Sequence, residues 1–165
     1  DNVDLPAVGY EPAKIEAGKL ANEARRLRTH YQLGLLDYIR NNKQQAGLKR
    51  IRAVMQALEK ASSQAQIRRL WKVVSALAEG LMQEGIAANV TIKMLLGSVD
   101  RELKLLLDVG DSEFATRYSR ELVKNALYYI GTCEVSTPAV DAVKSAYNLD
   151  QLMPHAEDDS GAVAV

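Results

Sequence analysis

The sequence has one cysteine and two histidines, and this scarcity excludes several kinds of site. Cys133 has no second cysteine with which to form an internal disulfide. Protein zinc sites are built from clustered Cys and His ligands, and Cys133, His30 and His155 do not provide such a set. We therefore expect no metal site.

The sequence also lacks the common loops of nucleotide-binding enzymes and serine hydrolases. Neither G-x-x-x-x-G-K-[ST] nor G-x-G-x-x-G occurs, and no G-x-S-x-G elbow is present. No apolar run approaches the length of a transmembrane helix, and no segment has a signal-peptide pattern. We expect a cytoplasmic protein without a cofactor and without membrane insertion, although scattered carboxylates leave an unrecognised enzyme open.

Charge is balanced overall but unevenly distributed along the chain. Residues 14–72 contain fourteen Lys/Arg and four Asp/Glu, a balance of +10 that the remaining residues offset. Either basic helices pack beside acidic ones and keep solvated outer faces, or the basic surface docks an acidic partner protein. Nucleic acid is not an expected partner, because the basic segment lacks interleaved aromatic residues and a known binding motif.

Apolar residues recur mostly every three or four positions through the chain, which predicts an all-α fold. Short polar links between the periodic segments predict an antiparallel helical bundle. The expected helices are residues 12–40, 47–61, 63–85, 89–110, 119–131 and 137–147. Residues 1–11 are expected to form an extended leader, residues 12–153 the bundle, and residues 154–165 a disordered acidic tail.

Three local expectations can be compared directly with a structure. Leu33, Leu36 and Ile39 lie off the main apolar stripe of the first helix, which predicts a central helix covered on several sides. Ser63 and Gln66 have the spacing of a capping box. The segment 111–118, "DSEFATRY", is expected to be a polar connection that follows a helix end at Gly110.

The stretch "HYQLG" at residues 30–34 is close to the H-x-x-K-G signature of a histidine phosphotransfer (Hpt) domain. Phosphotransfer requires an exposed ring nitrogen and a nearby cation for the phosphoryl oxygens. Leu33 occupies the position of the motif's lysine, and Arg26, one turn earlier, is the candidate substitute. Gly34 matches the glycine through which a response regulator approaches the histidine.

Five segments, in this order, carry a more extensive resemblance: "LRTHYQLGLLDYIRN", "LWKVVSALAEGL", "IKMLLGSVDRELKLLL", "ELVKNALYYIG" and "VKSAYNLDQLMP". Together they resemble the Hpt-like region of ChpA/PilL-type chemosensory histidine kinases of type IV pilus systems, and the related stand-alone FimL proteins. The resemblance covers residues 20–154 and does not separate these two groups. It implies a four-helix Hpt-like core with additional short helices, whose phosphoacceptor has been lost.

The resemblance implies a non-catalytic pseudo-Hpt scaffold module in the control of type IV pili and twitching motility, often at the cell pole. We expect it to bind a response regulator receiver domain or a polar scaffold protein. The proposed face is the basic set Arg25, Arg26, Arg28, Lys49, Arg50 and Arg52. Two alternatives remain: an active phosphotransfer domain that uses His30, and a structural bundle that forms a homodimer.

Overall fold

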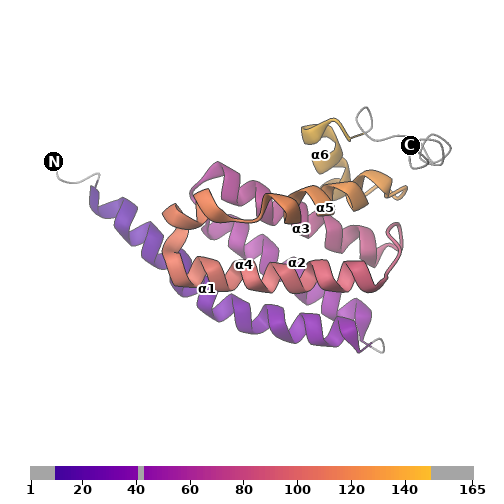
Figure 1. The fold of residues 1–165 in the computed structure, drawn as a ribbon, viewed down its shortest axis with the longest axis horizontal. Coiled ribbons are helices and arrows are strands. Elements are labelled where there is room, and N and C mark those ends of the chain that lie inside the picture. Colours follow the sequence, from indigo (N-terminus) through magenta and orange to yellow (C-terminus); the bar gives the residue numbers. More distant parts are fainter. Residues whose placement is uncertain (1–9, 41–42, 150–165) are drawn as a thin grey trace.

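The computed structural model describes residues 10–40 and 43–149, and these residues form six helices and no strand (Figure 1). The all-α prediction is confirmed. Most of the expected leader and the whole expected tail lie outside the described residues. The helices are α1 Tyr10–Ile39, α2 Gln44–Ala61, α3 Ala65–Met82, α4 Val90–Arg117, α5 Arg120–Thr132 and α6 Pro138–Tyr147.

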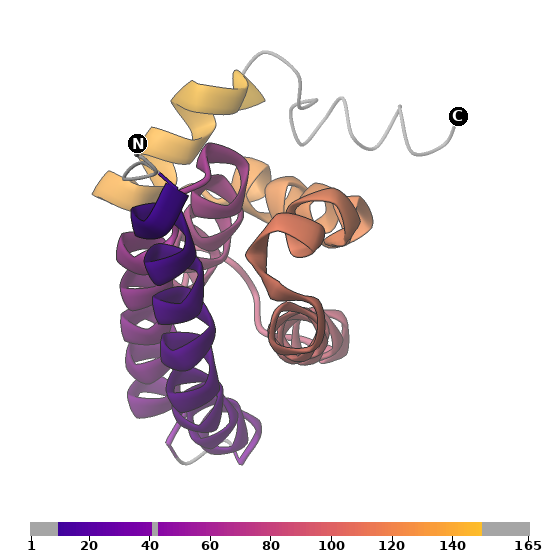
Figure 2. The same cartoon turned by 90° about the vertical axis from the view of Figure 1, so that its left-hand side faces the viewer.

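The helices pack in a bundle whose order differs from the order of the chain. Helix α1 packs against α2 and α4, α2 packs against α3, and α3 packs against α5 and α6. Figure 2 shows the indigo α1 at one side of the bundle and the orange α5 at the other. The N-terminal basic helices therefore meet the rest of the chain through α3 and α4.

Side-chain caps begin three of the helices. Asn89 accepts a hydrogen bond from the backbone N–H of Ile92, and Ser119 accepts one from Leu122. Thr137 caps α6 in the same way, with proline at the first helical position. Such caps satisfy N–H groups that have no partner inside the helix.

The expected capping box at Ser63 is wrong. Helix α3 begins at Ala65 after Gln64, and no side chain caps it. The carbonyl of Ser63 instead accepts a hydrogen bond of 2.6 Å from the guanidinium of Arg68. Trp71 also donates a hydrogen bond to the hydroxyl of Ser62. Side chains of α3 therefore hold the link that precedes this helix.

The segment 111–118 is largely helical, which corrects the expectation of a polar connection. Gly110 has φ +83°, a conformation that favours glycine, and it breaks the regular helix where the sequence predicted an end. The chain then resumes a helix as far as Arg117. Phe114 is fully buried and stacks on Trp71, with ring centroids 5.9 Å apart, so the core requires this segment to fold inward.

A partly buried carboxylate fixes the corner that follows. The Glu102 side chain accepts a hydrogen bond of 3.1 Å from the backbone N–H of Ser119, immediately before α5. Partial burial raises the pKa of Glu102, although this hydrogen bond acts in the opposite direction. The contact joins the middle of α4 to the start of α5.

The expectation for Leu33, Leu36 and Ile39 is also wrong. Their side chains are 48%, 43% and 42% exposed, so the second half of α1 is not enclosed on all sides. The buried stripe of α1 is instead narrow and includes Tyr31 and Tyr38, which are almost completely covered. The extra apolar residues form an outer surface of the bundle.

Helices α1 and α2 approach each other closely because both have glycine at their contact. A Cβ atom on Gly47 would lie 2.5 Å from the carbonyl oxygen of Gly34 and 2.6 Å from the backbone nitrogen of Tyr38. A Cβ atom on Gly34 would lie 3.0 Å from the carbonyl oxygen of Gly47. Since the distance between packed helices depends on the side chains at the contact, these residues set the α1–α2 spacing.

This packing predicts opposite effects for two Gly→Ala substitutions. Gly47→Ala forces backbone atoms apart and should lower the free energy of unfolding by about 1–3 kcal/mol. Gly97→Ala in α4 meets nothing within 4 Å, so its better helix propensity should stabilise the protein by up to about 1 kcal/mol. Urea unfolding followed by circular dichroism measures both, and equal shifts of the same sign would contradict the close packing at Gly47.

Candidate partner-binding face

The six basic residues expected to form one face lie on α1 and α2 but point in different directions. Three of them are exposed without a carboxylate partner among the described residues, and the other three form ion pairs. The first group is Arg25, Lys49 and Arg50; the second is Arg26, Arg28 and Arg52. Of the six residues expected to form the face, only Arg25, Lys49 and Arg50 are therefore exposed cations without a carboxylate partner among the described residues.

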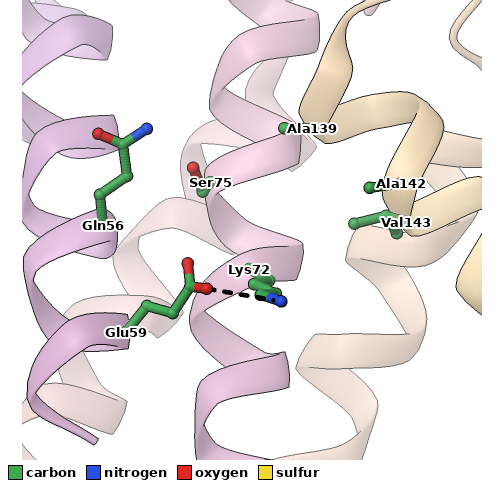
Figure 3. Close-up of a pocket in the computed structure, with 7 residues that line it drawn as sticks. All are labelled: Gln56, Glu59, Lys72, Ser75, Ala139, Ala142 and Val143. Carbon is green, nitrogen blue, oxygen red and sulfur yellow. Dashed lines mark ion pairs between the residues drawn. The ribbon is translucent and has the colours of Figure 1, made fainter.

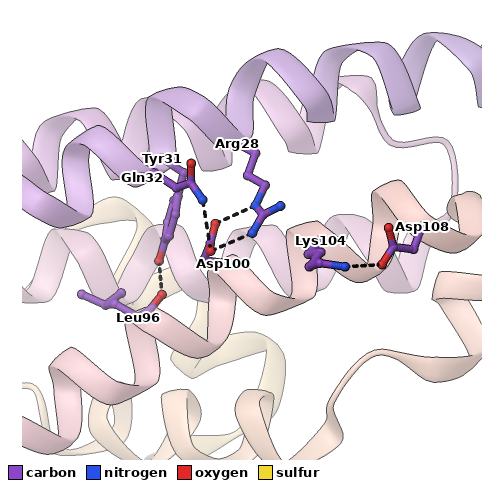
Figure 4. Close-up of polar contacts among 7 residues, drawn as sticks. All are labelled: Arg28, Tyr31, Gln32, Leu96, Asp100, Lys104 and Asp108. Carbon is purple, nitrogen blue, oxygen red and sulfur yellow. Dashed lines mark hydrogen bonds and ion pairs between the residues drawn. The ribbon is translucent and has the colours of Figure 1, made fainter.

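Arg28 points from α1 toward α4, where it donates two hydrogen bonds to Asp100 (Figure 4). The distances are 2.9 Å from Nε and 3.0 Å from Nη2 to the two carboxylate oxygens. Both side chains are mostly covered, with 25% and 19% of their surfaces exposed. The hydrogen bonds to Asp100 raise the pKa of Arg28. Arg28 therefore joins two helices and is not available to a partner.

The same interface contains a buried tyrosine. The Tyr31 hydroxyl donates a hydrogen bond of 2.6 Å to the carbonyl oxygen of Leu96 on α4. Complete burial, reinforced by the charge of Asp100, raises the pKa of Tyr31 well above its ordinary value. Gln32 adds a longer contact of 3.4 Å to Asp100 (Figure 4). These polar contacts fix how α1 lies against α4.

The two other paired arginines have weaker partners. Arg52 reaches Glu79 on α3 at 3.6 Å, and both side chains are partly covered. Arg26 lies 2.6 Å from Glu23 within α1, on an exposed surface where ion pairs contribute little to stability. Arg26 therefore has its own carboxylate and does not face His30 in this arrangement.

His30 has a cation beside it, but that cation comes from α2. The Nη1 atom of Arg50 lies 3.3 Å from Nδ1 of His30. A guanidinium only donates hydrogen bonds, so Nδ1 is the acceptor in this contact. The cation in contact with the ring is therefore Arg50, and not Arg26, the candidate substitute for the motif's lysine.

Hairpin geometry is the signal that could have found Arg50. His30 and Arg50 lie ten residues on either side of position 40, close to the link between α1 and α2. Gly34 and Gly47 are also nearly equidistant from that link. In an antiparallel helical hairpin such residues face each other, whereas comparing only residues within one helix cannot find them.

The arrangement around His30 differs from the expected Hpt site in a second way. Gly34 is buried against α2, so it serves helix packing and is not an opening for a response regulator. The His30 ring is only partly exposed, and its Nδ1 atom points at Arg50. In this arrangement Nδ1 of His30 is engaged by Arg50 and is not open to a phosphoryl group.

A small cavity of about 190 Å³ lies between α2, α3 and α6 (Figure 3). Its charged lining residues, Glu59 and Lys72, pair with each other at 3.6 Å. Ser75, Ala139 and Ala142 form much of the remaining wall. Small side chains form much of its lining, and its two charged residues already neutralise each other.

The described residues form neither a metal site nor a membrane span. No group of three or more His, Cys, Asp or Glu side chains in that part of the chain is placed to hold a metal ion. None of the helices there combines the length and the apolar content needed to cross a bilayer.

Comparison with known proteins gives a consistent result. Residues 16–160 match the family described as the FimL scaffold protein second domain. The chain is also similar to the scaffold protein FimL of Pseudomonas aeruginosa, with 29% identity across 91% of this chain and 26% of that protein. The chain thus spans about a quarter of the length of this relative. No solved structure matches.

The Arg28–Asp100 pair predicts a contrast between two aspartates of α4. Asp100→Ala leaves a covered guanidinium without its acceptor and should lower the free energy of unfolding by about 1–3 kcal/mol. Asp108→Ala removes an exposed pair with Lys104 at 2.8 Å, and its effect should stay within about 0.5 kcal/mol. Chemical denaturation of both variants measures the difference, which would vanish if Arg28 were freely solvated.

Proposed function

This chain belongs to the family of FimL scaffold protein second domains, and from that membership we propose that it is a non-catalytic interaction module of a scaffold. The family name and the printed name of the relative, scaffold protein FimL, support a role in binding other proteins. The proposed setting is the cytoplasmic chemosensory system that controls type IV pili and twitching motility, with a location at the cell pole.

The observation that carries the proposed mechanism is a set of cations without carboxylate partners. Arg25 and Lys49 are exposed on neighbouring helices and have no ion pair among the described residues. Arg50 has a polar contact only with the ring of His30 within that same part of the chain. Uncompensated positive charge of this kind attracts and orients an acidic protein surface. The proposed partners are an acidic receiver domain of a response regulator or an acidic polar scaffold protein.

The surroundings of His30 support a non-catalytic role. A histidine nucleophile needs an acceptor nitrogen that is open to the reacting phosphorus, and Nδ1 is already hydrogen-bonded to Arg50. The proposal is therefore that the bundle keeps the shape of a phosphotransfer domain and uses its surface for binding.

The same contact favours a second candidate function, an active phosphotransfer domain. If the Arg50 side chain moved away from Nδ1, its guanidinium would still lie near the ring and could neutralise a phosphoryl group on it. Rotation of an exposed arginine side chain is enough for that change. This candidate therefore has to be tested separately from partner binding.

We expect charge reversal on the proposed face to weaken partner binding. The double variant Arg25→Glu/Lys49→Glu should bind a receiver domain from the same pilus system about tenfold or more weakly, with a shallower dependence of affinity on salt. Arg101→Glu/Lys124→Glu on α4 and α5 has the same net charge change and should bind as the unaltered protein does. Calorimetric titration at two salt concentrations makes the comparison. Equal losses in both variants would show that net charge matters and this face does not.

Incubation with an isotopically phosphorylated receiver domain separates the two candidate functions. We expect no acid-labile, alkali-stable label on the protein. The alternative function requires such a label, which His30→Gln abolishes and His155→Gln leaves intact. A label with that pattern would replace the scaffold proposal by phosphotransfer at His30.

A further inference from the structure

Three large apolar side chains of α1 are exposed in an unbroken row. Leu33, Leu36 and Ile39 follow one another in steps of three residues and are 48%, 43% and 42% exposed. We call this row the α1 apolar stripe. Contiguous apolar surface is uncommon on proteins that work alone, and it frequently marks an interaction site.

Cations border the α1 apolar stripe along its length. Arg25 lies two turns before Leu33 on the same outer side of α1, and Arg40 lies one turn after Leu36. Helix α2 of this chain contributes Arg50, which contacts His30 one turn before Leu33. Between Arg25 and Arg40 the sequence contains a single acidic residue, Asp37. The stripe is therefore apolar at its centre and basic around it.

The charge pattern argues against a second copy of this chain as the occupant. A two-fold symmetric contact through the stripe would place the same basic surface of each copy against the other. Arg25, Arg40 and Arg50 would then face like charges without carboxylates to compensate them. An acidic occupant satisfies both the apolar centre and its basic border.

We infer that the α1 apolar stripe docks an amphipathic helix of a partner protein, with acidic residues beside the helix's own apolar face. This inference rests on the proposed role in partner binding and names the chemistry of the bound surface. The stripe runs for about 9 Å along a straight helix, a length that matches apolar anchors on successive turns of a docked helix. The border cations then pair with carboxylates on the flanks of the docked helix.

A second exposed apolar pair provides an internal control. Val90 and Met94 at the start of α4 are 70% and 67% exposed, which is more than any residue of the stripe. Met94 borders a groove whose charged lining residues, Arg101 and Glu121, have opposite signs. Apolar exposure is therefore available at both places, but the charges beside Val90 and Met94 include both signs, Lys93, Arg101 and Glu121, whereas those beside the stripe are mainly basic.

Two synthetic helical peptides test the inference with the complete chain. Both carry leucine at positions i, i+3, i+4 and i+7; one has glutamate beside the leucines and the other has lysine. We expect the acidic peptide to bind the unaltered protein at least about tenfold more tightly than the basic peptide. Leu33→Ser/Leu36→Ser should weaken binding of the acidic peptide by about tenfold or more. Val90→Ser/Met94→Ser should not change it.

Because all four substituted side chains are exposed, circular dichroism should show folded protein in both variants. Three results would overturn the inference: no binding of the acidic peptide, equal binding of the two peptides, or loss of binding only in the Val90/Met94 variant. A fourth is sedimentation of the unaltered protein as a dimer that Leu33→Ser/Leu36→Ser dissociates, because a second copy would then occupy the stripe.

The outcomes separate this inference from the proposed function. If the acidic peptide binds at the stripe but no receiver domain responds to Arg25→Glu/Lys49→Glu, the proposed partner class fails and the stripe stands. If a receiver domain binds through Arg25 and Lys49 while Leu33→Ser/Leu36→Ser changes neither its affinity nor that of the peptide, the stripe fails. The proposed function then remains.

Discussion

The close contact between Gly34 and Gly47 is the constraint on which the candidate face depends. Two helices that meet backbone to backbone cannot rotate or slide without a clash, so this contact determines which side chains of α1 and α2 point outward. It places His30 beside Arg50 at the edge of the helix pair. On the opposite flank of α1, the Arg28–Asp100 and Tyr31–Leu96 hydrogen bonds fix the position of α4. The remaining outer surface of α1 includes the apolar stripe.

The apparent phosphotransfer motif shows how the same residues can serve packing. Gly34 occupies a motif position, but its lack of a side chain is required by the carbonyl oxygen of Gly47. His30 occupies the phosphoacceptor position, but its acceptor nitrogen is taken by Arg50. Leu33, in place of the motif's lysine, contributes an exposed apolar side chain. The local geometry thus fits a surface for binding better than a site for group transfer.

The basic residues of the N-terminal half fall into two groups, those paired with carboxylates and those without a carboxylate partner in the described part of the chain. Arg28 and Arg52 neutralise carboxylates of α4 and α3, as expected for basic helices that pack beside acidic ones. Arg25, Lys49 and Arg50 remain without carboxylate partners in the described part of the chain, as a docking surface requires. The distinction depends on which way each side chain points, because a pair buried at an interface is already satisfied whereas a solvated cation can still exchange water for a partner.

The sequence by itself determined the helical class, most helix ends and the caps at Asn89, Ser119 and Thr137, because these depend on residues within a few positions of one another. The five segments quoted from it also led to the FimL family whose model matches the chain. Only the tertiary structure decided that Phe114 belongs to the core, that Leu33 and Leu36 are exposed, and that Arg50 meets His30. Those facts depend on contacts between helices far apart in the chain, and local periodicity contains no information about which neighbour covers a given face.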